Sequence, residues 1–350
     1  MKLYDKDGWL DCKHIETVAD RNGIAFILII GKRQIGKTYG VLKLMLDEDK
    51  RFVLLRGMKT ELEMLERNVN SPFEKIKGYE GRILFEKNSD YTADIFKLTP
   101  DYDGVDIKTL VGMGGALSSI GRVRGFNGDM FTDVVFDEFI PESHLLMVRH
   151  GDDAFLNMYT TISGNREIEG KPPLRVWLLA NSNNLDSDIL RALNVSKIVE
   201  KMSLSGEESR ILKDRGIMII LPDSEIITSK RKQGALYKAI DTTSKFSKMA
   251  YSNEFAYNDF TDVRNMSLNE YKALIAVGDI IIHIHKNDKT IYITEPYRIK
   301  DRLKRTYKNT DRDLLTFEHD YPELRRAYLK GRIIFQSMLA KNNFIEYLNL

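Results

Sequence analysis

The sequence offers almost no sulfur chemistry. Among 350 residues there is one cysteine, Cys12. A single cysteine excludes an intramolecular disulfide and any zinc cluster built from cysteines, and it is typical of a chain that works in a reducing cytoplasm. We expect Cys12 to be a small side chain without chemistry of its own.

Long apolar runs and an excess of one charge are also missing. The longest apolar run, 24–30, falls far short of the ~20 residues of a membrane span. The first residues, MKLYDKDGWLD, carry acids where a secretion signal would be basic and then apolar. We therefore expect a soluble, unprocessed chain without a membrane partner. Because 53 Lys and Arg face 51 Asp and Glu, no global field favours nucleic acid, and any DNA contact must be local.

The first half of the chain alternates apolar runs with helical patterns. Near-continuous β-branched and aliphatic runs occupy 24–30, 51–55, 132–139 and 174–181, and helical periodicity occupies 37–47 and 61–68. Strands that are apolar throughout are typical of a parallel sheet buried on both faces by helices. The pattern predicts an α/β fold for about residues 1–200.

After Asn181 the pattern changes, which indicates a second domain. A charged, weakly amphipathic stretch precedes a new apolar strand at 217–222, and 279–297 reads as a β-hairpin with a polar turn. The C-terminal residues read as amphipathic helices broken near Gly331. We predict a first domain over 1–197, a linker over 198–228 and a smaller α+β domain over 229–350.

Residues 31–38 match the phosphate-binding pattern G-x4-G-K-[ST], and they follow an apolar run and open a helical pattern, as this motif requires. The glycines let backbone N–H groups turn toward phosphate oxygens. Lys37 is expected to reach the β and γ phosphates, and the Thr38 hydroxyl to bind Mg2+. The motif predicts ATP and Mg2+ as cofactors, held by Gly31, Lys32, Arg33, Gln34, Ile35, Gly36, Lys37, Thr38 and Tyr39.

Polar side chains end two later apolar runs. Asp137 is expected to hold Mg2+ together with Thr38, and Glu138 to polarise the attacking water as a general base. An acidic pair in this place is typical of ATPases that activate water. Asn181 ends the next run, where an amide can sense the γ-phosphate; the alternative is an ordinary turn residue.

Four arginines are candidates for stabilising the transition state. Arg166 is the first candidate for a finger offered to a neighbouring subunit, and Arg124 is the second. Arg56 follows the second strand, near the expected nucleotide, and is a candidate for a lid or signalling residue within its own chain. Arg33, inside the phosphate loop, is a further candidate within one chain. The alternative for Arg124 is a DNA-backbone contact from the glycine-rich segment 112–128, which we expect to be a loop.

The order and spacing of four motifs resembles the DNA-packaging ATPases, or encapsidation proteins, of small tailed phages typified by Bacillus phage phi-29. These motifs are the phosphate loop with its internal arginine, the strand VFDEF, the segment Asn165-Arg166-Glu167 and the strand ending LLANSNN, and they span most of residues 20–185. The resemblance implies a terminase-like P-loop ATPase of the additional-strand catalytic-glutamate class. It also implies trans-acting roles for Arg166 and Arg124.

The same resemblance implies partners and a location. Members assemble as a ring, commonly a pentamer, on the portal or connector of an empty prohead and pump double-stranded DNA into it. Their C-terminal domain is RNase H-like without catalysis and attaches to the portal and, in some members, to a packaging RNA. The protein is then expected in the host cytoplasm and transiently on the prohead, and it is absent from the mature virion.

Two other classes of function remain open from the sequence. One is a DNA-stimulated ATPase or helicase that does not package, and the other is an ATP-dependent switch or scaffold. Glu138 beside Asp137 argues against a mere binder, because a switch needs no well-placed base.

Overall fold

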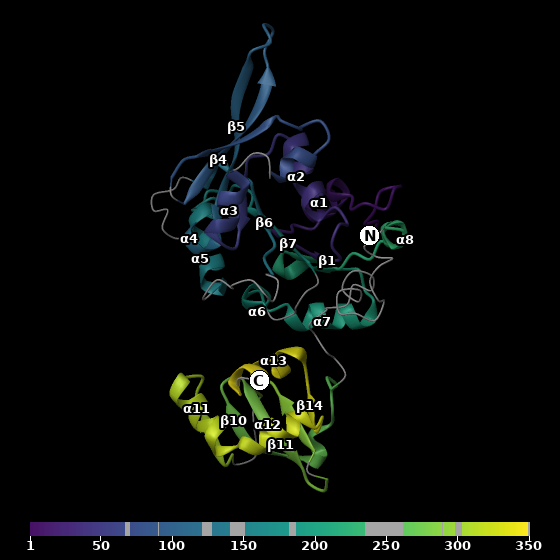
Figure 1. Ribbon diagram of the computed structural model, residues 1–350, viewed down its shortest axis with the longest axis vertical. Helices are drawn as coiled ribbons and strands as arrows, with labels where there is room; N and C mark the ends of the chain where they lie inside the picture. The colour runs from purple at the N-terminus through teal and green to yellow at the C-terminus, as the bar shows by residue number, and fades with distance from the viewer. Residues whose placement is uncertain are drawn as a thin grey trace. The chain divides into compact units, whose positions relative to one another are not determined.

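The computed structural model describes residues 1–66, 71–89, 91–120, 128–140, 151–181, 187–234, 262–288, 290–297 and 303–348. They divide into two compact units, each with its own sheet (Figure 1). The first unit holds the described parts of 1–193 and 201–256, and the second holds those of 194–200 and 257–350.

The first unit is built on a nine-stranded sheet in the order β3-β4-β5-β2-β6-β7-β1-β9-β8. The strands from β5 to β9 in this order pair in parallel, and the strands at both edges pair antiparallel. The predicted α/β class is confirmed. The strands are β1 (Phe26–Gly31), β2 (Phe52–Arg56), β3 (Ile83–Lys87), β4 (Thr92–Pro100), β5 (Asp106–Ala116), β6 (Asp133–Asp137), β7 (Arg175–Asn181), β8 (Ser209–Leu212) and β9 (Ile217–Ile220).

The helices of this unit pack apolar faces on the sheet, and Trp177 and Phe52 are fully buried in its core. Asp11 caps α1 by accepting from the His14 N–H at 2.9 Å, as N-terminal caps do. The helices are α1 (Cys12–Arg21), α2 (Lys37–Asp47), α3 (Lys59–Glu66), α4 (Leu117–Ile120), α5 (Gly151–Ser163), α6 (Asp188–Ala192), α7 (Ser196–Ser205, which straddles the division between the units) and α8 (Glu225–Lys232). Among the described residues, no helix combines the length and apolar character needed to cross a membrane.

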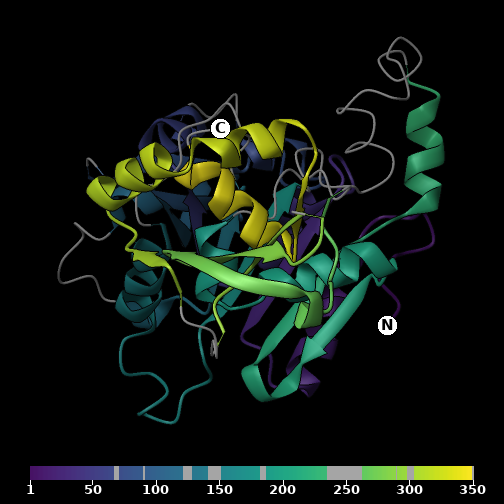
Figure 2. The ribbon, with the colours of Figure 1, turned by 90° about the horizontal axis from the view of Figure 1, so that it is seen from below.

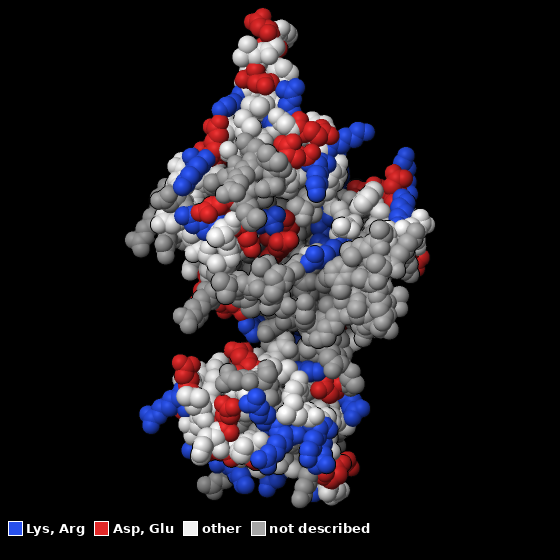
Figure 3. Space-filling view, viewed as in Figure 1, with Lys and Arg blue, Asp and Glu red and all other residues white. Residues whose placement is uncertain are grey.

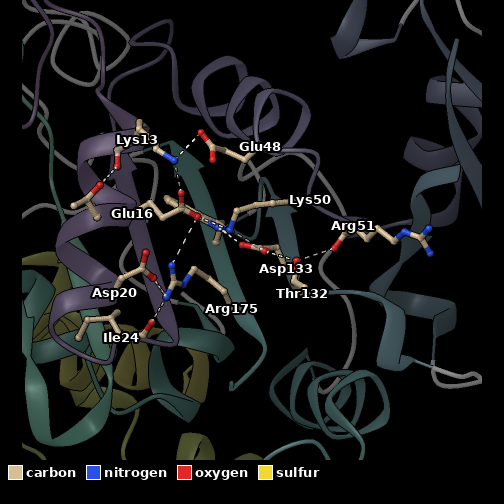
Figure 4. Close-up of polar contacts among 12 residues, drawn as sticks. Lys13, Glu16, Asp20, Ile24, Glu48, Lys50, Arg51, Thr132, Asp133 and Arg175 are labelled. Carbon is tan, nitrogen blue, oxygen red and sulfur yellow. Dashed lines mark hydrogen bonds and ion pairs between the residues drawn. The ribbon is translucent and has the colours of Figure 1, made fainter. Parts of the chain in front are cut away.

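Buried charges fasten α1 to the amino ends of the central strands (Figure 4). Lys50, just before β2, is ion-paired with Glu16 of α1 and lies 3.3 Å from Asp133 at the start of β6. Arg175, at the start of β7, pairs with Asp20 at 2.7 Å. Because Glu16 and Asp133 are almost fully buried, their charges depend on these partners.

The strands β4 and β5 form a long hairpin that extends beyond the rest of the first unit (Figure 1). Its tip carries acids, visible in Figure 3, and the fully exposed Tyr102. The hairpin was not predicted from the sequence.

The glycine-rich segment predicted as a loop is only partly one. Residues 112–116 belong to β5, and 117–120 form α4. A side chain at Gly112 would meet the Phe52 carbonyl oxygen at 2.7 Å, so glycine is required there by close packing against β2. Residues 121–127 lie outside the described part of the chain.

The residues predicted as a linker, 198–228, include two strands of the first sheet. β9 pairs in parallel with β1, from Phe26 with Ile217 to Ile29 with Ile220. The apolar run 217–222, which we assigned to the linker, therefore belongs to the sheet of the first unit. Its residues are fully apolar because both faces of β9 are buried.

The second unit has a five-stranded sheet in the order β13-β10-β11-β12-β14. The helices α11, α12 and α13 of its described part lie along one side of this sheet (Figure 2). The predicted hairpin is confirmed as β11 and β12. The short strand β14, which separates the C-terminal helices α12 and α13, was not predicted. Among its described residues no group of three His, Cys, Asp or Glu is placed to hold a metal. The elements are β10 (Tyr271–Val277), β11 (Ile280–His285), β12 (Ile291–Thr294), β13 (Arg305–Tyr307), α11 (Asp311–Asp320), α12 (Pro322–Leu329), β14 (Ile333–Phe335) and α13 (Met338–Tyr347).

Candidate active site

Four parallel neighbours, β2, β6, β7 and β1, end at one edge of the first sheet. Their last residues are Arg56, Asp137, Asn181 and Gly31, and Gly31 is directly paired with Asn181. β7 lies between the phosphate-loop strand β1 and the acidic strand β6. This is the additional strand that the family resemblance implies. The residues predicted from three separate motifs thus converge on one edge of the sheet.

The loop between β1 and α2 turns through two left-handed residues. Gln34 has φ +58° and Gly36 has φ +85°. Gly36 is the residue before α2, so the loop ends at the positive end of the helix dipole. Gly31 packs against Pro222, since a side chain at Gly31 would meet the proline ring at 2.8 Å. The loop is thus shaped by its glycines at both ends.

Lys37 points back under this loop. Its Nζ donates to the Gly31 carbonyl at 3.0 Å, to the Lys32 carbonyl at 2.7 Å and to Asn181 Oδ1 at 3.1 Å. The residue is only 8% exposed. Asn181 thus shares the site with the loop lysine, where an amide can sense a phosphate.

Thr38 and Asp137 form the second contact between loop and strand. Thr38 Oγ1 donates to Asp137 Oδ1 at 2.8 Å. Hydroxyl and carboxylate oxygens are the ligands that Mg2+ takes from proteins, usually with several waters. The donor set at this edge therefore fits the ion that the motif implies.

Arg56 bridges both members of the acidic pair. Its Nη2 lies 3.0 Å from Asp137 Oδ2, and its Nη1 lies 3.1 Å from Glu138 Oε2. The Arg56 Nε is buried without a hydrogen-bond partner. Arg56 was predicted beside the nucleotide as a lid or signalling residue, but its bridge to both carboxylates was not predicted.

Glu138 has an unusual backbone and an altered acidity. Its φ is +60°, a left-handed conformation that is strained for glutamate and typical of functional sites. Burial raises the pKa of the Glu138 carboxyl above its ordinary value, the Arg56 guanidinium lowers it, and the Asp137 charge raises it. The net pKa is raised, which moves Glu138 toward the range useful to a general base.

A cavity of about 530 Å³ joins these groups. Ser71, Pro72 and Lys75 also line it, and sequence reasoning missed them because they belong to no motif. Their short 3-10 helix, Pro72–Lys75, is brought to the site only by the fold. The predicted residues that line the cavity are Arg33, Gln34, Gly36, Lys37, Thr38, Tyr39, Arg56, Asp137, Glu138 and Asn181.

Two predicted loop residues face elsewhere. Ile35 is buried in the apolar core. Lys32 is 1% exposed, and its ammonium is paired with Asp223 and donates to Thr228 Oγ1 at 3.2 Å. Lys32 therefore ties the phosphate loop to the start of α8 and contributes its carbonyl, not its charge, to the site.

Arg166 lies away from this cavity. It is 5% exposed and donates to the carbonyls of Phe131 at 2.5 Å and Asp129 at 3.4 Å, at the amino ends of the strands. Arg166 therefore has no role at the site of its own chain. Arg124 lies outside the described residues.

No family model matches the sequence, and no curated protein sequence matches it. The solved structures that match over the whole chain include two phage packaging motors. The phi-28 gp11 DNA packaging motor is 17% identical with a TM-score of 0.59, and 99% of each chain is covered. The bacteriophage phi-29 viral genome packaging motor assembly is 18% identical with a TM-score of 0.63, and again 99% of each chain is covered. The chain thus has the fold of these phage motors over both of its units, as the motif resemblance implied.

Proposed function

We propose that this chain hydrolyses ATP and translocates double-stranded DNA into a preformed viral prohead, as one subunit of a ring. The observation that carries the proposal is one cavity that contains Lys37, Thr38, the Asp137-Glu138 pair and Asn181. The cavity sits at the strand ends of a fold shared with two phage packaging motors. Neither the motifs nor the fold alone distinguishes a motor from another ATPase.

In the proposed reaction, Lys37 moves from carbonyl acceptors to phosphate oxygens. Lys37 is the first residue of α2, so the phosphates would bind where a cation and a helix N-terminus come from the same residue. Asn181 Oδ1, now accepting from Lys37, stays within reach of the phosphate or the attacking water. Thr38 and Asp137 would hold Mg2+, whose charge would offset that of the phosphate oxygens.

Glu138 is the proposed general base, and Arg56 sets when it is available. The ion pair with Arg56 engages the Glu138 carboxylate, which then cannot accept a proton from water at full strength. A nucleotide phosphate competes for the guanidinium, so ATP binding would free Glu138 beside its substrate. The site would thus become competent only when it is filled.

The proposed trans role of Arg166 needs a structural change. Its guanidinium would have to leave the Phe131 carbonyl to reach a neighbour's nucleotide. Rings mixed from Arg166→Ala and Glu138→Gln subunits test the role, because each mutant could complement the other. Mixed rings no more active than either parent would reject it.

The proposed partners are double-stranded DNA, further copies of the chain and the portal. A packaging RNA for the second unit belongs to the same proposal. The phi-29 structure is described as a motor assembly, which supports a transient place on the prohead.

The decisive experiment is steady-state ATP hydrolysis with and without long double-stranded DNA, at two salt concentrations. We expect DNA to stimulate turnover and salt to weaken the stimulation, because phosphate contacts release counterions. Glu138→Gln should reduce kcat by roughly 10²- to 10⁴-fold. Glu63→Gln, which removes one exposed charge from α3, is the matched control.

Other outcomes select the other functions. Turnover that ignores DNA argues for a switch or scaffold, as does full function of a Glu138→Gln chain that still assembles. Strand displacement in a duplex-unwinding assay argues for a helicase.

A further inference from the structure

A second cavity adjoins the phosphate loop on its other side. Its volume is about 840 Å³, within the ~300–1,000 Å³ typical of ligand sites. It lies between the segment before α1, α1 itself and α2, and it shares Gln34, Gly36 and Tyr39 with the site cavity. A ligand whose phosphates occupy the loop can therefore extend into it.

Two aromatic side chains stand open to solvent in this cavity. Trp9 is 45% exposed and Tyr39 is 40% exposed. The Trp9 ring lies on the loop itself, since a side chain at Gly36 would meet Trp9 Cε3 at 3.2 Å. Exposed aromatic faces beside a phosphate site are suited to stacking on a flat ring.

Hydrogen bonds hold the backbone at Trp9 in place. Its backbone N–H donates to Asp5 Oδ1 at 2.9 Å, and its carbonyl accepts from the Asp5 N–H at 2.9 Å. Gly8, at φ +90°, packs on Ile226, and its carbonyl accepts from Ser224 Oγ at 2.8 Å. Because the backbone of Trp9 is already ordered, only the side chain has conformational freedom to lose when a ligand binds.

The charged side chains that line the cavity indicate which part of a ligand it can bind. Four carboxylates line it, against two lysines that are already paired with two of them, Lys13 with Glu48 at 2.6 Å and Lys43 with Asp47 at 2.9 Å. This excess of negative charge disfavours phosphate. The remaining carboxylates are Asp5 and Asp11.

We propose that this cavity is the nucleobase subsite, where a purine stacks on Trp9, with Tyr39 lining the path from the phosphates. The subsite rests on the proposed nucleotide binding at the loop, but it needs neither hydrolysis nor DNA. Trp9 then serves as a binding residue at the opposite end of the nucleotide from Glu138.

The chain provides its own reporter for this proposal. It has two tryptophans, and the other, Trp177, is fully buried in the core. A purine stacked on Trp9 should therefore change the fluorescence of Trp9 alone. ATP and inorganic tripolyphosphate, each with Mg2+, separate base contacts from phosphate contacts.

We expect ATP, but not tripolyphosphate, to quench the wild-type protein, and Trp9→Phe to lose the signal. By calorimetry, Trp9→Ala should weaken ATP binding roughly 10-fold and leave tripolyphosphate binding unchanged. Tyr102→Ala, at the exposed hairpin tip, is the matched control and should bind both ligands as the wild type does.

Three results would overturn the subsite. Unchanged ATP affinity in Trp9→Ala would place the base elsewhere, and equal weakening of both ligands would make Trp9 a support of the loop. A wild-type protein that binds neither ligand would reject the nucleotide site as well. Binding that depends on Trp9 without DNA-stimulated turnover would instead sustain the subsite and reject the motor.

Discussion

At the scale of single residues, the site is dominated by one guanidinium between two carboxylates. Arg56 lies within 3.1 Å of both Asp137 and Glu138, and it opposes the effect of burial on the pKa of Glu138. The availability and the acidity of the proposed base therefore depend on the same residue.

Replacing Arg56 should alter the pH dependence of turnover. Because Arg56 lowers the pKa of Glu138, Arg56→Gln should raise it further. A base works when deprotonated, so the acid limb of the kcat/KM profile, which reports the ligand-free enzyme, should move to higher pH. Lys59→Gln, which removes a cation paired with Glu63, should leave the limb in place. An unmoved limb in Arg56→Gln would show that Glu138 does not limit the rate.

The ionised Glu138 side chain should also lower the free energy of unfolding at neutral pH. The pKa of Glu138 is higher in the folded protein than in the unfolded chain. The protonated carboxyl therefore stabilises the fold fully below the unfolded pKa of about 4.3, and this stabilisation is lost as the pH rises through the folded pKa. Glu138→Gln should therefore be the more stable protein at pH 7.5, by less than about 1 kcal/mol because the side chain is half-exposed.

Urea unfolding at pH 7.5 and at pH 4.5 measures this difference. The gap between Glu138→Gln and the wild type should shrink at the lower pH. A gap that is constant with pH would mean that the glutamine acts through packing and not through charge.

At the scale of elements, buried charges connect α1 with the amino ends of β2, β6 and β7. Lys50 is ion-paired with both Glu16 and Asp133, and its own side chain is 22% exposed. The network lies at the edge of the sheet opposite the site, so it can be perturbed without touching the nucleotide.

Lys50→Met should destabilise the first unit by about 2–4 kcal/mol, because Glu16 and Asp133 would lose a cation in a buried setting. Lys43→Met removes an exposed i,i+4 pair with Asp47 and should cost about 0.5 kcal/mol or less. Thermal unfolding followed by circular dichroism compares the two. Equal effects would mean that the Lys50 contacts are as weak as surface pairs.

At the scale of the whole molecule, the two units have separate sheets and separate cores. Phe344 of α13 is fully buried among Ile282, Phe317 and Phe335 in the second core. All of the groups proposed to bind nucleotide lie in the first unit.

Phe344→Ala should therefore destabilise the second unit by about 3–5 kcal/mol and leave ATP affinity within error. Leu329→Ala, at a position 74% exposed on α12, is the control for a change without burial. Calorimetric unfolding and ATP titration on the same samples measure both effects. A matching loss of ATP affinity would mean that the nucleotide site depends on the second unit's fold.

The sequence by itself determined much of the first unit. The phosphate loop, the acidic pair and Asn181 could be predicted because each lies directly after a buried apolar strand, and parallel strands end at a common edge. Helix α2 has the predicted bounds, 37–47. These features can be predicted because each depends on a local pattern of a few residues.

Only the tertiary structure decided the long-range partners of three side chains and one strand. Lys32 reads as part of the phosphate loop, yet it pairs with Asp223, 191 residues away in the sequence. Arg166 was predicted as an arginine finger, but its buried guanidinium donates to the Phe131 carbonyl in its own chain. Trp9 belongs to no motif, yet its ring lies against Gly36. β9 joins the first sheet because its apolar side chains are buried when it pairs with β1. The physical reason is common to all four: a local pattern fixes the kind of element, whereas long-range packing selects which side chain meets which.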